Sequence, residues 1–119
     1  MAGVVQAPQK LLAVRLELTN GGGAANYDYT TTRRIEVLQV VGHKTQAAGL
    51  AGDTVTIRNA GNAITDAILV DNTVPDQTVI MNTTLNIANA TIASGGTLRA
   101  AVAGGGQEGC MLAIKVVPA

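Results

Sequence analysis

The sequence predicts an all-β domain, either a sandwich or a barrel, and two observations carry this prediction. Short segments in which apolar and polar residues alternate recur along the 119 residues, separated by glycine, asparagine and aspartate. No longer segment carries the apolar stripe and capping residues of an amphipathic helix. A chain of this length is expected to form one domain.

The expected strands share this alternation and are rich in β-branched residues. They are 11–18, 33–41, 51–61, 78–81, 84–93, 97–102 and 110–117. The segment 63–70 fits either a strand or a short helical turn. Within 33–41 the alternation places Val37 and Gln39 on one face of the strand, and Leu38 and Val40 on the other.

Two segments in the first part of the chain lack this regularity. Residues 1–10 are expected to form an irregular N-terminal arm, because Pro8 limits strand pairing. Residues 19–32 are expected to form a long glycine-rich loop. The chain is therefore divided into 1–32, which holds the arm, the first strand and this loop, and 33–119, which forms the β-sandwich core.

The composition indicates a surface that is covered by other protein. Charged residues make up 13% of the chain and the net charge is zero, whereas soluble domains usually carry about 25% charged residues. A monomer with so few charges is poorly protected against self-association. The only aromatic residues are Tyr27 and Tyr29. They offer a contact point for a partner, or they cover one end of the sandwich.

Neither nucleic acid nor a membrane is expected as a partner. The only adjacent basic pair is Arg33-Arg34, which is more typical of a solvated strand start than of a phosphate-binding patch. No apolar run approaches the ~20 residues of a membrane span. The segment MAGVVQAPQK lacks the charged and apolar regions of a signal peptide.

Residues suited to catalysis or metal binding are scarce. His43, the only histidine, is expected in a loop and in solvent, and Cys110, the only cysteine, is expected to be a small buried hydrophobe. Asp66, Asp71 and Asp76 lack the spacing of a calcium-binding loop, and DNTVPDQT is typical of a turn. We therefore expect no enzyme activity, no cofactor, no metal and no small-molecule substrate.

The segment GGGQEG, Gly104 to Gly109, matches the G-x-G-x-x-G pattern of a dinucleotide-binding loop. Such a loop must open a helix inside a βαβ unit, but the residues after Gly109 read CMLAIKVVPA, an apolar run of the β type. The glycines are therefore interpreted as the loop of a terminal hairpin in which 97–102 pairs antiparallel with 110–117.

The second part of the chain resembles the decoration, or cement, proteins of tailed bacteriophages. The resemblance is carried by AGDTVTIRN, AITDAILV, TIASGGTLRAAVAGGG and CMLAIKVVP, and it covers about residues 33–118. It implies a jelly-roll-like β-sandwich that binds the outer surface of a capsid as a homotrimer and stabilises it, without a cofactor. The implied partners are the major capsid protein and further copies of the chain. The implied location is the capsid surface of a virion made in the host cytoplasm.

The residues expected to contact a partner lie in the arm, the glycine-rich loop and the basic pair. They are Val4, Val5, Tyr27, Tyr29, Arg33 and Arg34. The alternative hypothesis is a glycan-binding module of a phage head or tail fibre. Sugar-binding sites usually present an aromatic platform, and in this chain only Tyr27 and Tyr29 could supply it.

Overall fold

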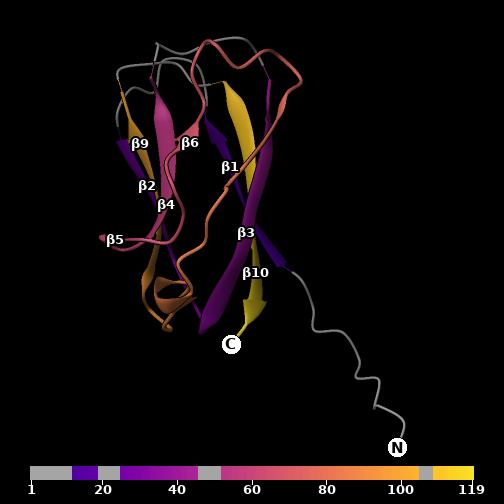
Figure 1. Ribbon diagram of the computed structural model, residues 1–119. Coiled ribbons are helices and arrows are strands. Elements are labelled where there is room, and N and C mark those ends of the chain that lie inside the picture. The colour runs from indigo at the N-terminus through magenta and orange to yellow at the C-terminus, as the bar shows by residue number, and fades with distance from the viewer. Residues whose placement is uncertain (1–11, 19–24, 46–51, 105–108) are drawn as a thin grey trace, which may run out of the picture.

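A computed structural model describes residues 12–18, 25–45, 52–104 and 109–119. In these residues the chain forms two antiparallel sheets that face each other as a sandwich (Figure 1). The first sheet contains β1 (Leu12–Leu18), β10 (Cys110–Pro118), β3 (Ile35–Lys44) and β7 (Val79–Met81), with β8 (Thr91–Ile92) also paired to β3. The second contains β2 (Ala25–Thr30), β9 (Thr97–Ala103), β4 (Thr54–Asn59) and β5 (Asn62–Ala63), with β6 (Ile68–Leu69) paired to β4.

The order of the strands makes this sandwich a jelly roll. The pairs are nested along the chain: β1 pairs with β10, β2 with β9, β3 with β7 and β8, and β4 with β5 and β6. Strands β1 to β4 alternate between the two sheets, and β9 and β10 do so again on the way back. This nesting is the topology of a double-sheet jelly roll, so the prediction of a jelly-roll-like sandwich is confirmed.

The prediction of a terminal hairpin is wrong. Strand β9 lies in the second sheet between β2 and β4, whereas β10 lies in the first sheet between β1 and β3 (Figure 1). The chain therefore passes from one sheet to the other between β9 and β10. In sandwiches of this kind the two sheets face each other about 10 Å apart. Alternation along a strand indicates which side chains lie on each face, but it does not identify the neighbouring strands. The strand that begins at Cys110 also means that no helix opens after Gly109.

The expected loop 19–32 is also wrong over residues 25–30, which form β2. Its register on β9 sets Tyr27 opposite Ala100 and Tyr29 opposite Leu98. Polar residues alternate with the tyrosines along β2, and the ladder to β9 overrides their weak strand propensity. Both β1 and β2 therefore belong to the sandwich, and the expected arm at 1–10 lies outside the described residues.

A β-bulge in β3 changes which of its side chains enter the core. Gln39 lies opposite Lys115 and Val37 opposite Val116, so Leu38 is the extra residue without a partner on β10. The expected faces are wrong beyond this point, because Val40 is fully buried together with Val37. The shift also turns Lys44, at the end of β3, toward the interior, where it has no exposed surface.

The segments between β4 and β9 contain less regular structure than expected. Residues 63–70 contribute the end of β5, an isolated bridge from Thr65 to Leu85 and the whole of the two-residue strand β6, but no helical turn. The expected strand 84–93 is reduced to β8, because Asn86 caps a short 3-10 helix, Ile87–Asn89, by accepting a hydrogen bond from the Ala88 amide. Asparagine side chains that bond nearby amides compete with a strand ladder, which explains the difference.

The core between the sheets is aliphatic, as the composition predicts. Val37, Val55, Ile57, Leu98 and Leu112 are among the side chains with almost no exposed surface. Cys110 is also fully buried in this core, as expected. The strands expected at 11–18, 51–61 and 78–81 are confirmed as β1, β4 and β7.

Candidate functional site

A groove runs along one side of the sandwich, between the edge strands β1 and β2 of the two sheets. It consists of two adjoining hollows of about 230 Å³ and 240 Å³, which share Val14 and Tyr29 in their walls. The inward side chains of β1 remain only half-buried because no strand continues the first sheet beyond it in the described residues. The groove therefore exposes aliphatic and aromatic surface at an open sheet edge.

The structure brings three of the predicted contact residues together in this groove. Tyr27 packs half-buried against the core, Tyr29 is 44% exposed, and Arg33 lines the end beside Leu12. Arg34 is exposed next to Arg33 but is not part of the groove wall. Both arginines directly precede β3, as expected of a solvated strand start. Val4 and Val5 lie outside the described residues.

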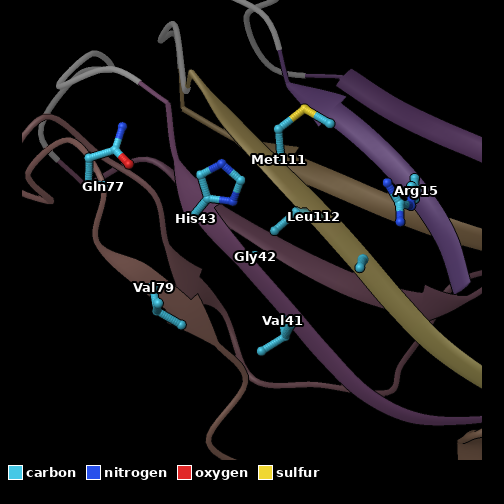
Figure 2. A pocket seen from close by; sticks show the side chains of 9 residues that line it. Arg15, Val41, Gly42, His43, Gln77, Val79, Met111 and Leu112 are labelled. Carbon is cyan, nitrogen blue, oxygen red and sulfur yellow. The ribbon is translucent and has the colours of Figure 1, made fainter.

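A separate hollow, of about 560 Å³, lies on the outer face of the first sheet (Figure 2). Strands β1, β10, β3 and β7 line it and present two rows of side chains across this face of the sheet, and Gln77 completes its wall. One row consists of Glu17, Met111, His43 and Val79, and the next of Arg15, Ala113, Val41 and Met81. The charged side chains thus lie at the β1 edge, and the apolar ones cover the rest of both rows apart from the imidazole.

Apolar exposure on this outer face was not predicted from the sequence. Val79 is 67% exposed and Met81 46% exposed, both on the short strand β7. His43 is exposed beside Met111 and belongs to strand β3, so its expected position in a loop is wrong and its exposure is confirmed (Figure 2). The signal in the sequence was the alternation in TVIM, which leaves two of its apolar residues on the solvent side.

A cluster of buried polar residues lies at the end of the sandwich where β3 finishes. The Lys44 ammonium donates a hydrogen bond to the Val70 carbonyl oxygen at 2.9 Å, and Asp53 is 1% exposed nearby in the chain segment before β4. Asp71 is 4% exposed and accepts hydrogen bonds from the hydroxyl and amide of Thr73. No pattern in the sequence indicates this cluster, because the bulge that turns Lys44 inward cannot be recognised from alternation.

Hydrogen bonding holds the pKa of the Asp71 carboxyl below its ordinary value. The largest cause is the Thr73 hydroxyl, followed by the Gly52 amide, which donates at 2.8 Å. The Thr73 amide and the positive charge of Lys44 act in the same direction, whereas burial opposes them. Asp71 is therefore a carboxylate that organises a turn, as DNTVPDQT predicted.

The other carboxyl groups whose pKa is lowered also have structural roles. Burial would raise the pKa of Asp66, but hydrogen bonds from Thr84 and Thr83 lower it below its ordinary value. A side-chain hydrogen bond from Arg99 lowers the pKa of Asp28, and the two form an ion pair at 2.8 Å between β2 and β9. Each of these carboxylates holds two strands or a turn together.

The described residues contain no group of three or more metal-ligating side chains. His43 has no acid or base partner among their recorded hydrogen bonds, and the deep polar groups at Lys44 and Asp71 serve backbone atoms and a turn. What the arrangement offers is surface for contact: the groove between β1 and β2, and the outer face of the first sheet.

Within the same described residues, no helix has the length and apolar character needed to cross a membrane. No protein-family model, curated protein or solved structure matches this chain.

Proposed function

We propose that this chain is a structural protein of a tailed-bacteriophage virion. It binds the outer surface of the capsid as a homotrimer, and it stabilises the shell as a decoration, or cement, protein. The observation that carries this proposal is the placement of its exposed apolar residues. Val79 and Met81 lie on the outer face of the first sheet and Tyr29 lies in the groove, whereas Leu69 and Ile87 are exposed elsewhere. The recorded interactions of the deep polar groups are structural.

The low charge of the chain supports contacts with other protein. Only 13% of its residues are charged, and Val79, Met81 and Tyr29 are large side chains left substantially in solvent. Stable protein interfaces are depleted in charge at their centres and enriched in methionine and aromatic residues. The resemblance of residues 33–118 to capsid decoration proteins names the class of partner. The jelly roll agrees with that class but also serves unrelated functions.

In this proposal, stabilisation of the shell requires no catalytic step. A protein that binds the assembled shell and not its dissociated subunits shifts the equilibrium toward the shell by mass action. At a free concentration one hundred times the dissociation constant, this shift is about 2.7 kcal/mol for each site. The effect therefore grows with the logarithm of the free concentration of the decoration protein, even after its sites on the shell are nearly full.

The test uses shells assembled from the major capsid protein of the same virus. The purified chain is expected to sediment with these shells and to raise the temperature at which they disassemble. The double variant Tyr29→Ala/Arg33→Ala should weaken co-sedimentation, and Arg58→Ala, on the outer face of the second sheet, serves as the matched control. Light scattering should give a mass that is a multiple of three chains. Failure of the wild type to sediment at saturating concentration contradicts the proposal.

A second candidate is a glycan-binding module of a phage head or tail fibre. The observation that favours it is Tyr29, which is 44% exposed in the wall of the groove, where its ring is available to a sugar. A glycan array distinguishes the two functions. Strong hits that disappear in Tyr29→Ala, together with no capsid binding, would favour the fibre.

A further inference from the structure

Strand β1 is the longest edge strand in the described part of the sandwich. It has seven residues and pairs on one side with β10, whereas β5, β6 and β7 at the other side have two or three residues each. Short strands, prolines and bulges commonly protect sheet edges from pairing with another chain. Strand β1 has neither a proline nor a recorded bulge, and among the described residues no strand pairs with its other side.

The charges on β1 are opposite in sign and two residues apart. Arg15 and Glu17 both point to the outer face of the first sheet, where their neighbours on β10 are Ala113 and Met111. Neither charge has an ion-pair partner among the described residues, where the recorded ion pair joins Arg99 and Asp28. Like charges along an edge would repel a second copy, but this arrangement can be self-complementary.

We propose that two copies of the chain associate by antiparallel pairing of their β1 strands, centred on Leu16. In this register Arg15 of each copy lies directly opposite Glu17 of the other, which gives two ion pairs on the outer face. Leu16 meets its own equivalent on the inner side. The first sheet of one copy then continues into the first sheet of the other across a twofold axis. Both copies contribute the same surface to this contact.

The charges favour this register over its neighbours. Centring the pair on Arg15 places the two arginines opposite each other, and centring it on Glu17 does the same with the two glutamates. Centring it on Val14 sets Arg15 opposite Ala13 and pairs no charges. A register centred between two residues would set an outward-facing residue of one copy opposite an inward-facing residue of the other. Because opposite residues lie on the same face of a sheet, the inner face of one copy would then continue into the outer face of the other.

The groove supplies the apolar contribution to this contact. Leu12, Val14 and Leu16 face inward from β1 but stay half-buried, and they pack against the edge of the core. A strand added beside β1 covers these side chains and continues the first sheet. This inference does not rest on the proposed function, although the contact covers the β1 side of the same groove. If trimers form through other surfaces, the same twofold contact joins two trimers, so it doubles the mass in either case.

The first experiment compares masses by sedimentation over a concentration series. The wild type should have twice the mass of Arg15→Glu and of Glu17→Arg, whose dissociation constants rise by about tenfold or more because both ion pairs become repulsive. The exchange Arg15→Glu/Glu17→Arg restores opposite charges and should recover the wild-type mass. Lys115→Glu is the control, because Lys115 lies on the same face but on the central strand β10. Equal masses for all five proteins would overturn the proposal.

The second experiment fixes the register and needs no charge change. Leu16→Cys sets two thiols directly opposite each other across the twofold axis, and mild oxidation should produce a covalent dimer. Val14→Cys, whose equivalents are four residues out of register, should remain uncrosslinked. Far-UV circular dichroism and thermal unfolding verify that each variant is folded. Crosslinking of Val14→Cys but not Leu16→Cys, or of neither, shows that β1 does not pair with itself in this way.

Discussion

The ammonium group of Lys44 has no exposed surface and donates a hydrogen bond to the carbonyl oxygen of Val70 at 2.9 Å. The backbone of Lys44 also bonds to Thr78 and Gln77, at 2.9 and 3.0 Å. One residue thus ties the end of β3 to both ends of the segment 70–78, which joins β6 to β7. Buried ammonium groups are costly unless they are compensated, so this end of the sandwich depends on its partners.

Replacing Lys44 by methionine is expected to lower the free energy of unfolding by about 3 kcal/mol. The substitution keeps most of the side-chain volume, but it leaves the Val70 carbonyl without its donor and removes the positive charge near Asp71. Urea unfolding monitored by circular dichroism measures the loss. Lys115→Met, on the outer face of the first sheet, should change the free energy by no more than about 0.5 kcal/mol. Equal effects of the two substitutions would show that the buried cluster contributes nothing special.

The Asp71 carboxylate is expected to make stability depend on acid. Its pKa in the folded chain lies below the unfolded value of about 3.9, so its contribution is present above that value and is lost as the pH falls through the folded pKa. Asp71→Asn should therefore be less stable than the wild type at neutral pH, and the difference should shrink on acidification. Urea midpoints at about pH 7, 5 and 3 give the comparison.

The control for this acid dependence is Asp28→Asn. Asp28 is an exposed carboxylate paired with Arg99 on the outer face of the second sheet, and its pKa is also lowered. Exposed ion pairs contribute little to stability, so the variant should follow the wild type closely across the pH range. A difference between the wild type and Asp71→Asn that stays constant down to low pH would mean that the carboxylate charge is not what stabilises the turn.

Alternation predicted an all-β sandwich or barrel and the position of most strands, because it is a local property. The jelly-roll-like topology was implied only by the resemblance of residues 33–118 to capsid decoration proteins. Alternation could not predict which strands pair. The apolar runs of β9 and β10 look like the two arms of a hairpin, yet their partners are 39 or more residues away in the chain. The bulge at Leu38 was equally hidden, since a single extra residue reverses the faces only after it. For that reason the burial of Lys44 could not be inferred from the sequence.

The candidate site was predicted only in part. Tyr27 and Tyr29 were singled out because they are the only aromatic residues, and Arg33 because it belongs to the only basic pair. The groove that joins them arises because the sheet edges β1 and β2 lie on the same side of the sandwich, which is a property of the topology. The apolar outer face of the first sheet depends on the register of four strands and could not be inferred from any one of them.

The two tyrosines are expected to separate stability from binding. Tyr27 packs against the core, so Tyr27→Ala should lower the free energy of unfolding by about 2 kcal/mol. Tyr29 is 44% exposed, and Tyr29→Ala should cost about 0.5 kcal/mol while it weakens attachment to shells or glycans. Thermal unfolding and co-sedimentation on the same preparations separate the two effects. If Tyr29→Ala binds as well as the wild type, the groove is not the contact surface.

Gly104, the first glycine of GGGQEG, is expected to be required for stability rather than for binding a nucleotide. Its φ of +107° lies in the region that favours glycine, and a Cβ atom there would collide with the buried carboxylate of Asp53. Gly104→Ala should therefore lower the free energy of unfolding by about 3 kcal/mol.

Gly61→Ala is the matched control for this substitution. A Cβ atom at Gly61 meets nothing within 4 Å, and its φ lies outside the positive range, so the change should be close to neutral. Differential scanning fluorimetry followed by urea titration compares the three proteins. A Gly104→Ala variant as stable as the wild type would mean that the chain relaxes around Asp53. The glycine would then have no structural role at the point where the chain leaves β9 to cross between the sheets.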